Sequence, residues 1–123
     1  MNVILVGHCG PDNHMLKAMA ERVLDGAEIH LVNDDAALAD HHGDEATWLV
    51  NRVLDGDFNV GESGLDLIKA RLEQSPGARV LLISDLEEHQ ATAEGHGARP
   101  GFGKKGLYDE VSANRLRAAA DIA

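Results

Sequence analysis

Three short and almost uninterrupted apolar runs lie along the chain, at residues 3–6, 47–50 and 79–83. Runs of this kind are typical of parallel strands whose two faces are both covered by helices. Weaker patterns predict two more strands, one over 28–32 and one around 99–103. Pro100 lies in the second of these and has no amide hydrogen, so that strand is expected at an edge of the sheet.

Between the apolar runs, hydrophobic residues recur at helical spacing. The clearest case predicts a helix over 11–25. Its apolar positions are Met15, Leu16, Met19, Val23 and Leu24. Pro11 and Asp12 suit the opening turn of this helix, and Gly26 suits its end.

The remaining helices are predicted from caps and stop signals. Ser63 is expected to cap a helix that the Ser-Pro-Gly sequence at 75–77 terminates. Shorter helices are predicted near 35–42, where Gly43 is the stop, and near 86–95. A last helix is supported by the apolar residues Leu107, Val111 and Ile122.

Strands and helices therefore alternate along the whole chain. With right-handed crossovers, this alternation predicts an α/β fold with a doubly wound, five-stranded parallel sheet in the order 2-1-3-4-5, a flavodoxin-like three-layer sandwich. Ligands of such sheets bind beyond the carboxyl ends of strands one and three, where the winding reverses. Here those ends carry Gly7, His8 and Cys9, and Asn51.

The length of 123 residues favours one domain over 1–123, without a separate output domain. Hydrophobic residues make up 44% and charged residues 26%, which is ordinary for a soluble globular protein. The single cysteine, Cys9, agrees with a reducing compartment and is more typical of a small buried hydrophobe than of a reactive thiol.

Eleven basic residues against 21 acidic ones give a net charge of −10. This charge repels a phosphate backbone, so nucleic acid is not an expected partner. The first apolar run is too short for a signal peptide or a membrane span, so we expect no membrane association and a cytoplasmic location.

Other ligand motifs match the sequence poorly. Asp55, Asp57, Asn59 and Asp66 stand at positions 1, 3, 5 and 12 of a loop like that of a calcium-binding EF-hand. Val60 stands where that loop needs glycine, and a solvated acidic loop before a capped helix explains the same residues. The histidines and Cys9 lack the spacing of metal ligands, and the glycine pattern of a dinucleotide fold is absent, so no cofactor is expected.

The polar residues after the apolar runs carry a family resemblance. Gly7 and His8 follow the first run, Asn51 the second and Ser84 the third, and a Lys104-Lys105 pair comes later. In this order and spacing the chain resembles a two-component receiver domain. The resemblance implies an acidic pair for Mg²⁺ after the first strand, a phosphorylated aspartate after the third, a serine or threonine after the fourth and a lysine after the fifth.

Both carboxylate sites are empty in this chain. The amide of Asn51 is not the nucleophile that forms an acyl phosphate, Gly7 has no side chain, and the nitrogen of His8 is a poor ligand for Mg²⁺. The sequence thus resembles a degenerate receiver, a pseudo-receiver, in which Ser84 and Lys105 remain at the other pocket positions. Gly106 stands where the family usually has proline, which leaves the register of Lys104 against Lys105 open. Each pocket residue also has a structural interpretation, as a partner of nearby backbone groups.

We therefore expect a stand-alone, non-enzymatic receiver-like protein that acts in signal transduction by binding another protein. The resemblance implies a signalling partner such as a kinase or an output protein, with a second copy of the chain as an alternative. It also places the contact surface within 85–123. The candidate contacts there are Leu86, Glu87, Glu88, Phe102, Leu107 and Tyr108. For Phe102 and Leu107, packing inside the domain is an equal alternative.

Two other functions stay open. A ligand sensor or enzyme would use the crevice at the ends of strands one and three, with Lys105, Ser84 and His8 around a small anion or a nucleotide. A relocated phosphoacceptor would use Asp55 or Asp57, but those carboxylates are expected on a long loop without a pre-organised Mg²⁺ site.

Overall fold

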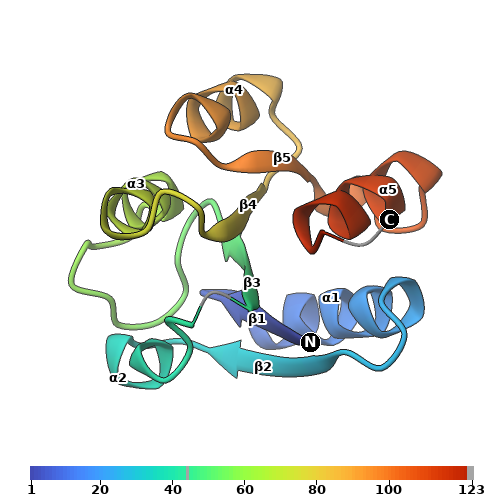
Figure 1. Cartoon of the computed structure of the whole chain (residues 1–123), viewed down its shortest axis with the longest axis horizontal. Coiled ribbons are helices and arrows are strands. Elements are labelled where there is room, and N and C mark those ends of the chain that lie inside the picture. The colour runs from blue at the N-terminus through green and yellow to red at the C-terminus, as the bar shows by residue number, and fades with distance from the viewer. Residues whose placement is uncertain (44, 122–123) are drawn as a thin grey trace.

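Strands and helices alternate around one sheet in the computed structural model, which describes residues 1–43 and 45–121 (Figure 1). The strands are β1 (Asn2–Val6), β2 (Glu28–Val32), β3 (Ala46–Asn51), β4 (Arg79–Ile83) and β5 (Arg99–Phe102). The helices are α1 (Gly10–Val23), α2 (Asp35–Ala39), α3 (Gly64–Gln74), α4 (Glu87–Gly95), a 3₁₀ turn η1 (Lys104–Gly106) and α5 (Glu110–Ala119).

All five strands are parallel, and their order is β2-β1-β3-β4-β5, as the alternation of elements predicts. In the centre of the sheet Leu5 of β1 lies opposite Leu31 of β2 and Leu49 of β3. The strand that contains Pro100 is an edge strand, which confirms the prediction from its missing amide hydrogen.

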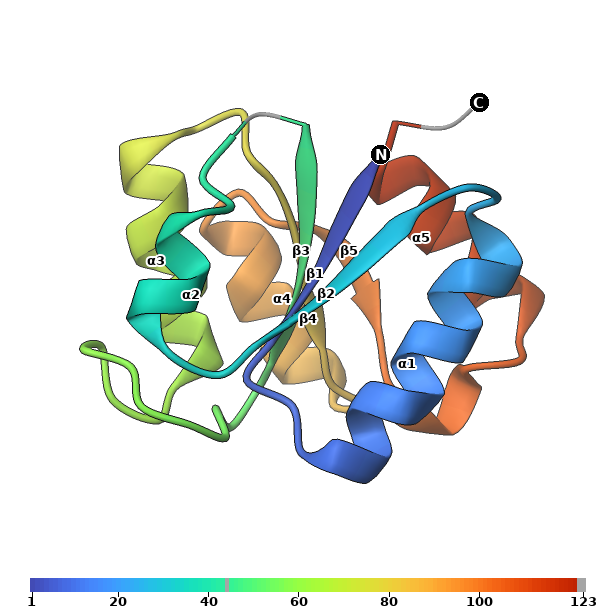
Figure 2. The same cartoon turned by 90° about the horizontal axis from the view of Figure 1, so that it is seen from below.

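The helices form a layer on each face of the sheet: α1 and α5 cover one face, and α2, α3 and α4 cover the other (Figure 2). Successive residues of a strand point to opposite faces, so a strand covered on both sides is apolar throughout. In β1, Leu5 packs into the cluster under α1 and α5, and Ile4 packs into the cluster with Trp48 and Ile68 on the other face.

Helix boundaries follow the predicted caps, with two differences. Ser63 caps α3 through its hydroxyl oxygen, which accepts the Asp66 N–H at 3.3 Å. The helix predicted over 35–42 ends at Ala39, because the chain turns there and the carbonyl of His41 accepts the Trp48 indole N–H at 3.0 Å. Leu107 precedes α5 instead of lying in it, and Ile122 lies outside the described residues. No helix within 1–43 and 45–121 is long and apolar enough to cross a membrane.

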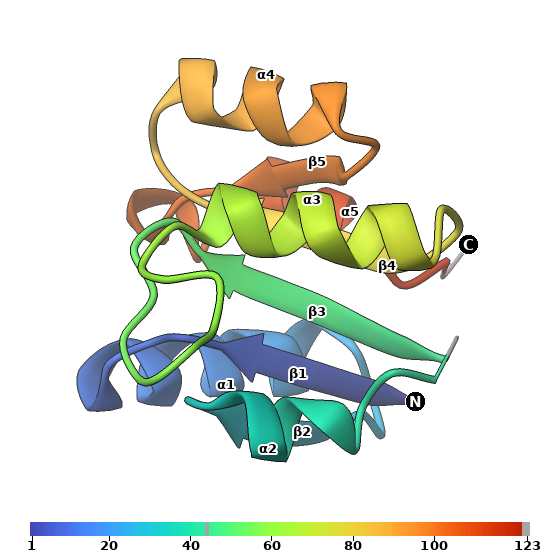
Figure 3. The ribbon, with the colours of Figure 1, turned by 90° about the vertical axis from the view of Figure 1, so that its left-hand side faces the viewer.

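The loop between β3 and α3 folds back over the carboxyl ends of the strands (Figure 3). Its Leu54 and Phe58 are buried in the core, and the Leu54 N–H donates to the Glu62 carbonyl at 2.7 Å. The loop therefore covers the edge of the sheet at which the switch-point crevice was expected.

Candidate functional site

The side chain of Asn51 is the centre of a hydrogen-bond network at the carboxyl edge of the sheet. Its Nδ2 donates to the carbonyl of Gly7 at 3.0 Å and to the carbonyl of Val53 at 2.8 Å. Its Oδ1 accepts from the ammonium of Lys104 at 3.3 Å. Two carbonyl partners on one end and a cation on the other fix the orientation of the amide.

This network requires an amide. A carboxylate at position 51 has no hydrogen to donate, so one of its oxygens would face the two carbonyl oxygens that Asn51 now binds. Asn51 therefore bonds to nearby backbone groups, as the structural interpretation of this residue proposed.

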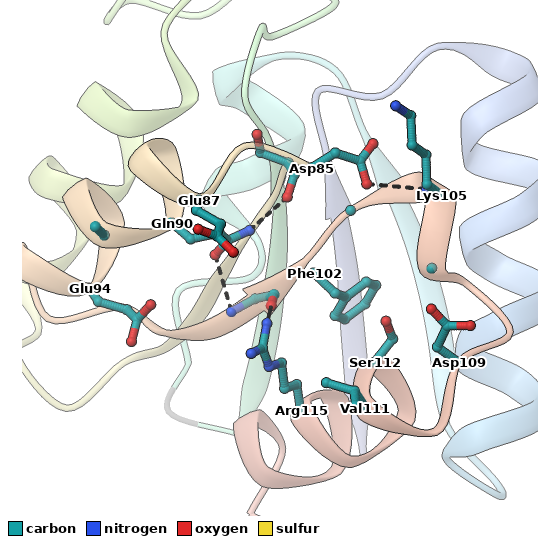
Figure 4. Close-up of a pocket in the computed structure, with 15 residues that line it drawn as sticks. Asp85, Glu87, Gln90, Glu94, Phe102, Lys105, Asp109, Val111, Ser112 and Arg115 are labelled. Carbon is teal, nitrogen blue, oxygen red and sulfur yellow. Dashed lines mark hydrogen bonds between the residues drawn. The ribbon is translucent and has the colours of Figure 1, made fainter.

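Lys104, and not Lys105, enters the pocket. The ammonium of Lys104 lies 2.6 Å from Asp12 Oδ2 and also reaches Asn51. Successive residues of a 3₁₀ turn are rotated by about 120°, so two adjacent lysines point in different directions. The register that the sequence left open is thus decided against Lys105: its backbone N–H donates to Asp85 Oδ1, and its side chain stands beside Asp85 (Figure 4).

Asp12 is a functional residue of this pocket that the sequence analysis missed. Its carboxylate lies in the first turn of α1, and the hydrogen bond from Lys104 is the main cause that lowers its pKa. From the sequence, Asp12 was predicted only to be an acidic residue in the first turn of a helix. The short connection between β1 and α1 is a signal that could have identified Asp12. It brings the first turn of α1 to the same edge of the sheet as Asn51.

His8 is buried and neutral. Only 1% of the residue is exposed, and its Nε2 donates to the carbonyl of Leu49 at 2.9 Å. The pKa of His8 is lowered to about 4, mainly by burial; the charge of Lys104 acts in the same direction, while the bond to Leu49 and the charge of Asp12 act against it. With Nε2 bonded to a carbonyl, His8 holds β1 to β3 and offers no oxygen ligand for Mg²⁺.

Gly7 has a backbone that a larger residue would strain. Its φ is +75°, and a Cβ there would lie 2.6 Å from Leu54 Cδ2. The Gly7 carbonyl accepts from Asn51 and from the N–H of Asp55. An acidic side chain at this position would therefore have to displace the loop that covers the strand end.

Ser84 is held by the start of α4. Its hydroxyl oxygen accepts the N–H of Leu86 at 3.3 Å and lies 3.2 Å from Nδ1 of His89. Its hydrogen bonds are therefore local, and the pocket consists of the backbone of Gly7 with the side chains of His8, Asn51, Lys104 and Asp12.

The comparisons with known proteins address the fold. No family model matches the chain. No curated protein matches it either. Solved structures do match it: a response regulator receiver protein from Pseudoalteromonas atlantica is 13% identical over 98% of both chains, with a TM-score of 0.73. The chain has the fold of a receiver domain.

Two further receiver structures support this result. The receiver domain of NtrX from Brucella abortus is 23% identical over 98% of this chain and 95% of that chain, with a TM-score of 0.65. The BeF3-activated receiver domain of DrrB is 16% identical over 98% of this chain and 97% of that chain, with a TM-score of 0.68. At these identities the likeness establishes the receiver fold and not the chemistry of the pocket.

The loop residues considered for calcium do not converge in this receiver fold. The N–H of Asn59 donates to Asp35 at 2.6 Å, the N–H of Asp57 donates to the Asn33 carbonyl, and Asp66 lies in the first turn of α3. Within residues 1–43 and 45–121, no three His, Cys, Asp or Glu side chains are placed to hold a metal ion. The EF-hand interpretation, which included Asp55, is therefore wrong, and the acidic loop before a capped helix describes these residues.

The candidate contact residues divide into exposed and buried ones. Phe102 and Leu107 are 4% and 5% exposed and pack in the core under α1 and α5, so their assignment to a contact surface is wrong. Tyr108 is 88% exposed, with the guanidinium of Arg22 at 4.9 Å from its ring centroid. The other exposed candidates are Leu86, Glu87 and Glu88.

Proposed function

We propose that this protein is a pseudo-receiver: a non-enzymatic, cytoplasmic signalling protein that is not phosphorylated by the Asp/Mg²⁺ mechanism and acts by binding another protein. The observation that carries the proposal is the hydrogen bonding of Asn51. Its amide occupies the position of the phosphoacceptor and is engaged with two carbonyls and with Lys104.

The other requirements of receiver chemistry are also unmet. Position 7 has no room for a carboxylate under Leu54, and His8 is a buried neutral imidazole. Asp12 is paired with Lys104, and one carboxylate cannot serve both as phosphoacceptor and as the acidic pair that holds Mg²⁺.

The same ion pair argues against the alternative of an anion or nucleotide sensor. That alternative needed a lysine whose charge no carboxylate balances, and Asp12 balances the charge of Lys104. A relocated phosphoacceptor at Asp55 or Asp57 lacks support too, because no group of His, Cys, Asp or Glu side chains among the described residues is placed to hold a metal ion.

Binding of a partner is proposed for the surface of α4, β5 and α5. Leu86, just before α4, and Tyr108, between η1 and α5, are large exposed side chains. A tyrosine that is exposed in the free protein offers a large contact area with a polar tip. We expect Tyr108→Ala to weaken the complex while the fluorescence of the buried Trp48 stays unchanged.

The decisive experiment is incubation with a small phosphodonor and Mg²⁺, followed by intact-mass measurement. We expect no mass gain for the wild-type chain or for Asn51→Asp, which restores a carboxylate without its metal pair. An acid-labile gain of one phosphoryl group on the wild type would overturn the proposal. The variant Asp12→Asn, measured in parallel, would show whether Asp12 carries that group.

A further inference from the structure

A groove of about 520 Å³ lies between α4, β5 and the start of α5 (Figure 4). Gly101 and Phe102 of β5 contribute to its floor, and Val111 of α5 lines it with a side chain that is 60% exposed. An exposed valine beside a hollow of this size is a place for an apolar side chain of a partner.

The main-chain N–H and carbonyl of Gly101, at the floor of the groove, already have hydrogen-bond partners. The N–H of Gly101 donates to Gln90 Oε1 at 3.2 Å, and its carbonyl accepts from Arg115 at 2.7 Å. Side chains from α4 and α5 thus occupy the main-chain groups at this point of the edge strand. Because strand addition needs these groups to be free, an occupant must bind through its side chains.

The charge of the groove is negative. Carboxylates line it from both sides, those of Asp85, Glu87, Glu94 and Asp109. None of the four takes part in an ion pair within the described residues. Two cations also line it, Arg115, which donates to the Gly101 carbonyl, and Lys105, which stands beside Asp85, so four carboxylates face two cations.

We propose that this groove binds a basic segment of a partner protein, in which a lysine or arginine lies beside an apolar side chain. The inference rests on the proposed function and adds the chemistry of the partner. Cationic side chains complement the unpaired carboxylates, and the apolar side chain contacts Val111. A second copy of this chain, with its net charge of −10, would bring like charges together.

A phage-displayed library of random peptides, selected on the intact chain, tests this inference. We expect the enriched peptides to combine Lys or Arg with an apolar residue, and their affinity to fall as NaCl rises. Synthetic copies of these peptides are then measured by fluorescence anisotropy. Enrichment of acidic or neutral peptides, or of none, would overturn the inference.

Matched charge variants inside and outside the groove show where the selected peptide binds. Glu87→Gln/Glu94→Gln removes two groove charges, and Glu21→Gln/Glu73→Gln removes two exposed charges from α1 and α3, outside the groove. We expect about tenfold weaker binding for the groove variant and unchanged binding for the control. Equal affinities would overturn the inference.

The two proposals fail in different ways. Peptides that bind α4, β5 and α5 but are acidic would refute the basic partner and leave the proposed surface intact. Peptides whose binding depends on Asp55 or Asp57, and not on Tyr108, Glu87 or Glu94, would move the interface to the β3–α3 loop and so refute the proposed surface itself.

Discussion

At the scale of single residues, Asn51 shows how one amide can connect three elements at the edge of the sheet. The amide donates to Gly7 and Val53 and accepts from Lys104, so it links the ends of β1 and β3 to η1. The charge of Lys104 is then balanced by Asp12 from α1.

Replacement of this amide tests its role. We expect Asn51→Asp to lower the free energy of unfolding by about 1–2 kcal/mol, because it removes two donors and leaves two carbonyls without them. Urea unfolding followed by Trp48 fluorescence measures the effect. Asn114→Asp is the control, since Asn114 is exposed on α5 and its side chain accepts from Arg117 on the same helix. A loss no larger than that of the control would contradict the role of the amide.

His8 is the residue that links folding to pH. Its pKa is about 4 in the folded chain because of burial, compared with 6.5 when exposed. Below pH 6.5 the unfolded chain binds the proton more readily, so stability is complete above this pH and falls as the pH drops towards 4. The difference in pKa corresponds to roughly 3 kcal/mol of folding free energy.

Urea unfolding at pH values above 6.5 and near 4 checks this dependence. The variant His8→Gln has no group that titrates there, so its stability should change much less over the same range. The stability of this variant will still depend on pH to some extent, because burial and the charge of Arg71 also lower the pKa of His42. Equal pH dependence of variant and wild type would show that His8 is not the cause.

Part of the pocket could be predicted from single residues. Gly7, His8 and Asn51 follow apolar strands, and parallel strands bring their carboxyl ends to one edge, so their proximity follows from the pattern. The choice of Lys104 over Lys105 depends on the rotation of η1, which no periodicity in the sequence reveals. The pairing of Lys104 with Asp12 joins positions 92 residues apart and has no local signal.

At the scale of elements, the edge strand β5 is protected on its open side. Pro100 provides no N–H, and Gln90 and Arg115 bind the N–H and carbonyl of Gly101. An edge strand with free main-chain groups pairs readily with another chain. Two side chains from different helices thus keep this edge from pairing.

Loss of Arg115 should expose this edge. We expect Arg115→Ala to lower the free energy of unfolding by about 1 kcal/mol and to increase self-association, because the Gly101 carbonyl loses its donor. Sedimentation velocity and urea unfolding measure the two effects. The control Arg117→Ala removes a guanidinium from the same helix that bonds to Asn114 of that helix. Equal behaviour of the two variants would mean that Arg115 does not protect the edge.

Elements were predictable where their signals are local. The strand over 28–32 and the cap at Ser63 match the structure, since both depend on neighbouring residues. The helix predicted over 35–42 was too long, because a bond between His41 and Trp48, seven residues apart, draws the chain out of the helix. Phe102 and Leu107 are apolar residues near a surface, and only the packing of α1 and α5 shows that they are buried.

At the scale of the whole molecule, the order of the strands could be predicted from the sequence, whereas the packing of the loop over 52–63 could not. The order 2-1-3-4-5 follows from alternating elements and right-handed crossovers, which the sequence displays directly. The loop over 52–63 brings Leu54 close to Gly7, where an added Cβ would lie 2.6 Å from Leu54 Cδ2, and the sequence does not display this approach. Under the proposed function, a chain with a receiver fold would lack receiver chemistry without any change of topology.

A receiver without an acyl phosphate has no covalent source of free energy to shift between two states. Any change of state must then come from a partner or ligand that binds one state better than the other. The proposed pseudo-receiver would be competent to bind its partner at all times, and the amount of protein and the affinity of the partner would set its output.

This proposal gives a prediction for the whole domain. The receiver domain of DrrB is activated by BeF3. Beryllofluoride completes its coordination with a carboxylate oxygen, which Asn51 lacks, and a Mg²⁺ ion beside it requires oxygen ligands that Gly7 and His8 do not supply. We therefore expect the ¹H–¹⁵N spectrum of this chain to be the same with and without beryllofluoride and Mg²⁺, while the DrrB domain, measured in parallel, responds. Shifts spread over α4, β5 and α5 would show that the pocket still drives a change of state, and the interpretation of Asn51, Lys104 and Asp12 as a closed network would have to be abandoned.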